Sequence, residues 1–234
     1  MNGIITIAGK EIKSYFSTPA AYIIIVLFLS LTGWFFTNTL FIEGGRSELS
    51  SNFGLIPFLF MFFIPALTMK MIAEEKKSGT IELLTTLPVT GGQIVAGKFF
   101  GSLFIILLAV LLTFPNILTI GILGEPDWGV LLTSYAGLIL MGAAFAAIGI
   151  YASAVTDNQI VAFIISFFVL FFLVMISNIL VFLPFPEFFS YLGVNSHYEN
   201  TLKGIIDTKD IVYFLSIIII FITAAAESLE SKRK

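Results

Sequence analysis

The sequence has no cysteine, a single histidine and few charged residues, and each scarcity excludes a class of protein. Without cysteine, the chain forms neither disulfide bonds nor thiolate metal sites. One imidazole at His197 with one nearby carboxylate at Glu199 provides too few ligands for a metal centre. Charged side chains make up 12% of the 234 residues, whereas soluble domains carry about a quarter. We therefore expect neither a metal site nor a water-soluble fold.

Long hydrophobic stretches dominate the sequence instead. Hydrophobic residues make up 58% of the chain, and the mean hydropathy is +1.02. A helix that crosses a bilayer needs about 20 mostly apolar residues. The six predicted spans cover residues 20–42, 53–72, 97–122, 128–155, 159–183 and 208–226. We therefore predict an all-α integral membrane protein with one transmembrane domain over residues 1–234.

The distribution of lysine and arginine predicts how the chain lies in the membrane. Cytoplasmic loops of membrane proteins carry an excess of these residues. If the N-terminus is inside, nine of the twelve positive side chains are cytoplasmic. The other three, Arg46, Lys203 and Lys209, lie outside. We therefore predict that both termini are cytoplasmic.

Residues 4–17, before the first span, have the period of an amphipathic helix. The apolar side comprises Ile4, Ile5, Ala8, Ile12, Tyr15 and Phe16, and Lys10 falls opposite them, although Ile7 and Glu11 do not fit this pattern. Such a helix lies flat in the membrane interface with its lysines toward the headgroups. The alternative is an ordinary short cytoplasmic helix.

The spans differ in their side chains. The fourth span is rich in glycine and alanine, which allow helix backbones to approach closely in lipid. The second and fifth spans are rich in phenylalanine. Candidates for the lining of a pathway are Phe58, Phe62, Phe167, Phe171 and Asn178, although such phenylalanines also commonly face lipid or core. Between the last two spans, residues 184–207 mix aromatic and polar side chains, which indicates short helices at the outer interface.

Two kinds of energy source are missing from the sequence. The centres of the spans carry no charged side chain, whereas ion-coupled carriers use such groups as relays. Residues 92–98 match a P-loop up to Lys98, but Phe99 replaces the hydroxyl residue that holds magnesium. This stretch also leads into a membrane span. We therefore expect no catalytic site and no cofactor in this chain, and any energy for transport would come from another subunit.

The cytoplasmic loop between the second and third spans has the most informative pattern. Two glutamates followed by two lysines at residues 74–77 precede a short helix predicted over about residues 78–88. Ile81, Leu84 and Leu87 form an apolar ridge on that helix, and Pro88 ends it. An exposed apolar ridge indicates a partner groove. The alternative is an interfacial turn that packs on its own bundle.

The same loop, Glu74 to Val89 followed by Gln93 to Phe99, resembles the signature of type-2 ABC transporter permeases. Within that family, the chain resembles the gliding-motility branch nearly from end to end. The matching segments are Lys10–Pro19, Gly124–Gly129, Asp157–Val161, Ser196–Glu199 and Gly204–Asp207. Permeases for drugs, sodium and copper share the loop.

The resemblance implies an ABCG-like exporter fold with six spans, an N-terminal elbow helix and a cytoplasmic coupling helix, in the inner (cytoplasmic) membrane. Cytoplasmic ABC ATPase subunits, which hold the ATP and magnesium, would bind two permeases: two copies or this chain and a paralogue. An auxiliary membrane protein with a large extracytoplasmic domain typically accompanies this branch. The implied ATPase contacts are Glu74, Glu75, Lys76, Ser78, Gly79, Thr80, Ile81, Glu82, Leu84, Leu87 and Pro88. Asp157, Asn158 and Gln159 would form a secondary inner contact.

Three hypotheses for the function follow. The first is a non-catalytic permease that couples hydrolysis by a partner ATPase to export. The second is a mechanical or regulatory membrane subunit that works on an extracytoplasmic partner and translocates nothing. The third, ranked last, is an ion-coupled secondary transporter.

Overall fold

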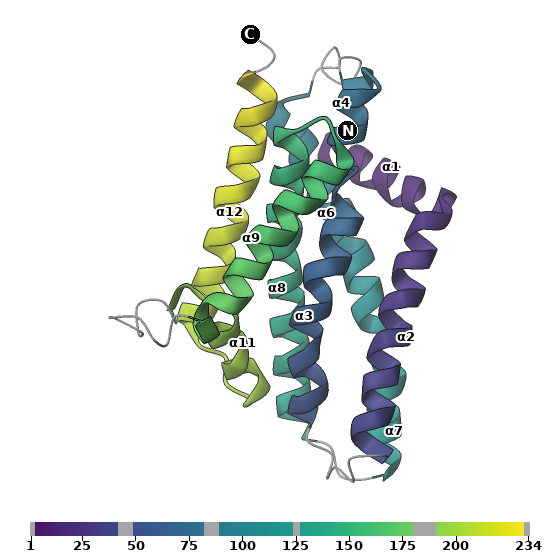
Figure 1. The fold of residues 1–234 in the computed structure, drawn as a ribbon, viewed down its shortest axis with the longest axis vertical. Helices are drawn as coiled ribbons and strands as arrows, with labels where there is room; N and C mark the ends of the chain where they lie inside the picture. The colour runs from purple at the N-terminus through teal and green to yellow at the C-terminus, as the bar shows by residue number, and fades with distance from the viewer. Residues whose placement is uncertain (1–2, 42–48, 82–88, 124–126, 180–190, 232–234) are drawn as a thin grey trace.

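The structure, a computed structural model, describes residues 3–41, 49–81, 89–123, 127–179 and 191–231, and they form an all-helical bundle (Figure 1). Six stretches are long and apolar enough to cross a membrane, which confirms the predicted number of spans. The elements are α1 (Gly3–Ser17), α2 (Pro19–Phe41), α3 (Leu49–Thr68), α4 (Ala73–Lys77), α6 (Gly91–Leu111), α7 (Phe114–Leu123), α8 (Trp128–Val155), α9 (Gln159–Ile179), α11 (Val194–Leu202) and α12 (Thr208–Ser231).

The glycine- and alanine-rich helix α8 forms the centre of the bundle. It packs against α3, α6, α9, α11 and α12, and most of its side chains are buried. A Cβ at Gly142 would lie 2.9 Å from Ile106 and 3.3 Å from Phe60, so only glycine allows these neighbours to approach. The small residues therefore act in packing, as the sequence predicted.

The third span begins earlier than predicted because its first turn is capped. The Thr90 hydroxyl accepts a hydrogen bond from the Gln93 backbone amide, and the Gln93 side chain accepts one from the Thr90 amide, both at 3.2 Å. This reciprocal capping box satisfies two amides that would otherwise lack partners. As a result, α6 starts at Gly91 instead of at residue 97.

The same span is broken toward its C-terminal end, and the hydropathy pattern did not predict this break. Helix α6 ends at Leu111, and α7 starts at Phe114. Pro115 has no amide hydrogen and its ring collides with the carbonyl of the preceding turn, so it interrupts the helical hydrogen bonds. The Thr113 hydroxyl donates to the Val110 carbonyl at 2.6 Å and satisfies a group at the break.

The two ends of the bundle differ in their elements. One end of the bundle contains α1, α4, the C-terminal part of α12 and the turn from α8 to α9 (Figure 1). Helix α1 lies across this end at an angle to α2. We call it the lysine-rich end, because it carries Lys10, Lys13, Lys70, Lys76 and Lys77. The opposite half carries α7 and α11, and we call it the α11 end.

Candidate functional site

The turn between α3 and α4 is held by one hydroxyl group of the central helix. Ser153 of α8 accepts hydrogen bonds from the amides of Ile72 and Ala73, at 3.0 and 2.9 Å, and donates to the Met69 carbonyl at 2.9 Å. Ser153, Ile72 and Ala73 are almost fully buried. Because buried backbone groups need partners, this contact fixes the start of α4 to the centre of the bundle.

A second contact joins α4 to the C-terminal end of α8. The ammonium group of Lys76 donates to the Ala154 carbonyl, and the hydroxyl of Ser228 on α12 donates to the same carbonyl at 3.2 Å. A cation at the C-terminus of a helix is favourable because the helix dipole is negative there. Helices α4, α8 and α12 therefore meet at one backbone oxygen.

Beyond α4 the chain reverses and exposes a short surface. Gly79 has a φ of +70°, a conformation that favours glycine. Ser78 and Thr80 share a hydrogen bond of 2.9 Å between their hydroxyls. We call the exposed residues of this surface the rim: Glu74, Lys77, Ser78, Gly79 and Thr80.

Thr80 and Ile81 are helical, in agreement with a helix that starts near this point. Ile81, the first member of the predicted apolar ridge, is half-buried and packs against the bundle instead of facing solvent. The remaining predicted contacts, Glu82, Leu84, Leu87 and Pro88, lie outside the described residues.

Helix α1 is seated on α6 through two glycines. A Cβ at Gly97 would lie 2.7 Å from Ile7, and a Cβ at Gly101 would lie 2.7 Å from Glu11. The buried side of α1 therefore includes Ile7 and Glu11, which fitted the predicted apolar side poorly, whereas Ile5, assigned to that side, is 69% exposed. The predicted helix is present, and its side toward α6 includes residues outside the predicted apolar side.

Between the glycines, Lys98 connects three elements of the lysine-rich end. Its ammonium group lies 2.7 Å from Glu11 of α1 and 2.8 Å from Glu75 of α4. Residues 92–98 belong to the continuous helix α6, so they form no phosphate-binding loop. The misfit of Glu11 on α1 was the signal in the sequence that could have identified this contact.

Tyr15 ties the other end of α1 to the bundle. Its hydroxyl donates to the Leu67 carbonyl near the end of α3 at 2.8 Å. Burial, and secondarily the Glu11 carboxylate, raises the pKa of the Tyr15 hydroxyl, so it stays protonated as a donor. Lys70 lies over the Tyr15 ring at 5.2 Å from its centroid.

A polar cavity of about 300 Å³ opens beside these contacts. Its walls come from α1, the turn after α3, α4 and α6, with lysines and glutamates on both sides. The lining includes Lys10, Glu11, Ser14, Lys70, Glu74, Glu75, Thr80 and Lys98. The lysine-rich end therefore combines tight ion pairs with open space next to the rim.

The predicted secondary contact lies at the same end. Asn158 caps α9, because its side-chain oxygen accepts a hydrogen bond from the Ile160 amide at 2.9 Å. Asp157 and Asn158 are exposed, and Gln159 is half-buried. Since α4 packs against both α8 and α9, these side chains and the rim belong to one surface region.

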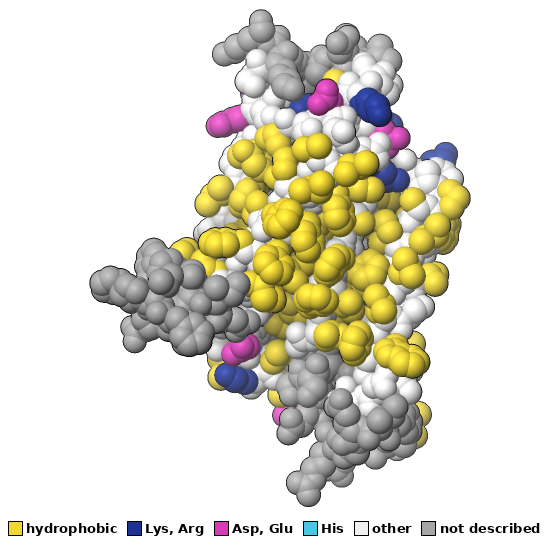
Figure 2. Space-filling view, in the orientation of Figure 1, with side chains coloured by type: hydrophobic (Ala, Val, Ile, Leu, Met, Phe, Trp, Pro, Cys, Tyr) yellow, Lys and Arg dark blue, Asp and Glu magenta, His cyan; other side chains and the backbone are white. Residues whose placement is uncertain are grey.

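The phenylalanines proposed for a pathway form an aromatic face on α3 and α9, visible as part of the hydrophobic surface in Figure 2. Phe58 and Phe62 contact each other at 5.4 Å between ring centroids, and Phe62 reaches Phe167 at 4.9 Å. Phe167 stacks on Phe171 at 6.0 Å. The side chain of Asn178 lies outside the described part of the chain.

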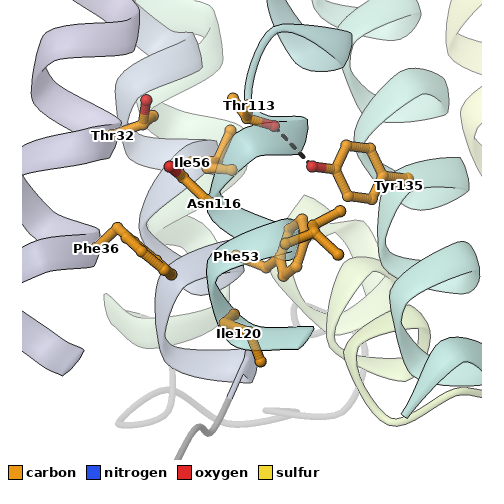
Figure 3. A pocket seen from close by; sticks show the side chains of 9 residues that line it. Thr32, Phe36, Phe53, Ile56, Thr113, Asn116, Ile120 and Tyr135 are labelled. Carbon is orange, nitrogen blue, oxygen red and sulfur yellow. Dashed lines mark hydrogen bonds between the residues drawn. The ribbon is translucent and has the colours of Figure 1, made fainter. Parts of the chain in front are cut away.

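A small cavity lies between α2, α3, α7 and α8 (Figure 3). Tyr135 and Thr113 share a hydrogen bond of 2.7 Å beside it, and Asn116 and Thr32 also line it. Its volume is about 30 Å³, which suffices for one or two water molecules. This cavity is too small to hold a lipid or a peptide.

At the α11 end, His197 has a structural role. Its Nδ1 lies 2.6 Å from an Asp210 carboxylate oxygen, and its Nε2 lies 2.9 Å from the Tyr191 carbonyl. Glu199 is exposed. Among the described residues, no three His, Cys, Asp or Glu side chains lie close enough together to hold a metal ion.

These observations define a membrane protein with six spans, an N-terminal helix across one end and an exposed segment tied to its central helix. The sequence profile of the ABC-2 family transporter proteins matches residues 5–231, so the chain belongs to this family. The family provides membrane components of ABC transporters, which generally associate in pairs with ABC ATPases. No curated protein matches the sequence.

Proposed function

We propose that this chain is the permease subunit of an ATP-driven exporter and that a partner ATPase binds the rim and the helix predicted to follow it. One observation carries the proposal: the exposed, polar rim directly follows a buried turn that Ser153 hydrogen-bonds to α8, the most buried of the described spans. A force on the rim would therefore reach the core directly. Asp157 and Asn158 would widen the same contact.

The central helix α8 offers the route from one end of the bundle to the other. Ser153 binds the turn before α4 near one end of α8. Near the other end, the Thr133 hydroxyl donates to the Thr201 carbonyl of α11 at 2.7 Å. Closure of the ATPases would shift α8 between two packings and thus move the α11 end.

The aromatic face supports a pathway between two permease subunits. Phe58, Phe62 and Phe171 remain exposed in the single chain, and the cavity of Figure 3 holds only water-sized groups. A second copy or a paralogue would cover this face, and substrate would pass between the subunits.

We assign the lysine-rich end to the cytoplasm and the chain to the inner membrane. The excess of lysine there follows the charge distribution of membrane proteins. The rim would then face the compartment that contains ATP. Both termini would be cytoplasmic as well.

Substitution of rim residues tests the proposal. Thr80→Arg and, in the predicted helix, Leu84→Arg place a long charged side chain in the contact, and we expect the co-purified ATPase to fall at least about tenfold, the equivalent of about 1.4 kcal/mol. Ser231→Arg, an exposed position on α12 at the same end, is the matched control and should retain the ATPase. Undiminished association of the Thr80 and Leu84 variants, with normal thermal stability, would refute the assignment.

A second candidate function is mechanical work on an extracytoplasmic partner without transport, as in a gliding-motility-type complex. The connection from the turn before the rim through α8 to α11 favours it, because motion could pass along these contacts whether or not a substrate is bound. Sealed vesicles that contain the whole complex distinguish the candidates. ATP-dependent accumulation of a lipid, peptide or ion would support export and count against the mechanical role.

A further inference from the structure

Lys98 is a buried cation whose two counterions come from different helices. Its side chain is 1% exposed, and the side chains of Glu11 and Glu75 are 12% and 17% exposed. An unpaired charge in such surroundings is strongly unfavourable, so the separation of one partner is resisted. The Lys98 ammonium group therefore acts as a joint between α1 and α4.

The backbone around Lys98 keeps this joint short. Gly97 and Gly101 let α1 approach α6 so closely that Ile7 and Glu11 would collide with a Cβ at either position. Glu11 is thus held on the Lys98 side by packing as well as by charge. Glu75 belongs to the short helix α4, whose start is fixed by Ser153. Both carboxylates are presented to Lys98 by elements that are anchored independently.

A neighbouring lysine provides an internal comparison. Lys10 lies 3.7 Å from the other carboxylate oxygen of Glu75, and its side chain is 60% exposed. Exposed ion pairs of this kind contribute little to stability, because water and salt screen the attraction between the two charges. The connection between α1 and α4 therefore depends on Lys98 and not on Lys10.

We infer that Lys98 is a positioning residue that makes α1 follow α4 when the partner ATPase moves the rim. This inference rests on the proposed function. If α4 moved alone, Lys98 would lose Glu75 or Glu11 in a site with little access to water. Because Pro19 starts α2 two residues after α1 ends at Ser17, a displacement of α1 would pass directly into the first span.

Spin-label distances test this inference, and the absence of native cysteine makes the labelling specific. Cysteines at the exposed positions Lys13 on α1 and Lys77 on α4 are labelled in the full permease–ATPase complex in lipid nanodiscs. We expect the same distance distribution without nucleotide and with ATP. In Lys98→Met, the distance distribution should become broader and should change with nucleotide. The matched variant Lys10→Met should give the same distribution as the labelled chain that retains both lysines.

A neutral variant covers the case in which Lys98→Met does not fold. The triple change Lys98→Met, Glu11→Gln and Glu75→Gln removes all three charges, so it leaves no buried ion without a partner, and it should also uncouple the two labels. Nucleotide-independent distances in this variant, with the ATPase bound, would overturn the inference even if its melting temperature were lower. Failure of the unlabelled chain, with Lys77 in place, to bind the ATPase would instead overturn the proposed function, and this inference with it.

Discussion

The two ends of the bundle are both hydrogen-bonded to α8, but they use different chemistry. At the α11 end, the Tyr198 hydroxyl donates to the Phe53 carbonyl at 3.1 Å, and Asn200 donates to Asp210 at 2.9 Å. Burial raises the pKa of Tyr198, so it remains a donor. Asp210 and His197 are themselves buried. These contacts close the α11 end around a small polar network.

The lysine-rich end is more open. It has the exposed rim, a cavity of about 300 Å³ and an ion-paired lysine between two helices. The cavity leaves space into which the elements of this end can move, whereas a buried network with all its donors matched has one favourable arrangement. We interpret the lysine-rich end as the part whose helices shift relative to one another. The α11 end would then be displaced as one rigid unit.

The largest effect on stability should come from the α11 network. Asp210→Ala removes the acceptor of both His197 and Asn200, and breaking a buried pair of this kind costs about 3–5 kcal/mol. Glu199→Ala, which removes an exposed carboxylate of α11, is the matched control and should change little. Thermal unfolding of the purified permease in nanodiscs measures the melting temperature of each variant. Equal melting temperatures for the two variants would show that the network is not the rigid part.

A smaller loss of stability is expected where Ser153 of α8 binds the turn before α4. Ser153→Ala leaves the Ile72 and Ala73 amides and the Met69 carbonyl without their partner, which should cost about 2–3 kcal/mol. Thr133→Val, which removes one hydroxyl near the other end of α8, should cost about 1 kcal/mol. The same unfolding measurement compares the loss of stability in the two variants. A larger loss for Thr133→Val than for Ser153→Ala would mean that α8 is attached more strongly to the α11 end than to the lysine-rich end.

Hydropathy predicted the spans because the membrane imposes their length and composition. The glycine and alanine residues of the fourth span likewise identified the packing helix, since no other helix is so rich in small side chains. Composition could not place the break between α6 and α7, although Pro115 was visible, because prolines are tolerated within other spans: α3 contains Pro57 and Pro65.

The candidate site was only partly predictable. The charged pattern after the second span drew attention to the loop in which residues 77–80 are exposed. The contacts that hold this surface could not be found from the sequence, because Ser153 lies 80 residues from Ala73 and Lys98 lies 23 residues from Glu75. A single serine among alanines and a lysine at the edge of a span have no distinctive pattern. Their roles depend on which helices meet.

The close approach of α3 to α8 gives a more modest prediction. A Cβ at Gly149 would overlap the Thr68 hydroxyl and lie 3.0 Å from its Cβ. Gly149→Ala should therefore cost about 1–2 kcal/mol through overpacking next to the turn that Ser153 holds. Gly33→Ala is the control, because a Cβ there meets nothing within 4 Å. Similar melting temperatures would indicate that α3 can shift at the lysine-rich end without loss of stability.

The smallest effect is expected from the exposed ion pair of the α11 end. The backbone amide and the ammonium group of Lys209, at 3.0 and 3.1 Å, lower the pKa of Asp207. A lowered pKa in the folded state stabilises the protein above the unfolded value, about pH 4, and the benefit is lost as the pH falls through the folded value. Asp207→Asn should thus lower stability slightly at neutral pH and not at all in strong acid. A pH series of melting temperatures for the two proteins checks this, and a large gap at neutral pH would show that the α11 end depends on its exposed charges as well as on its buried network.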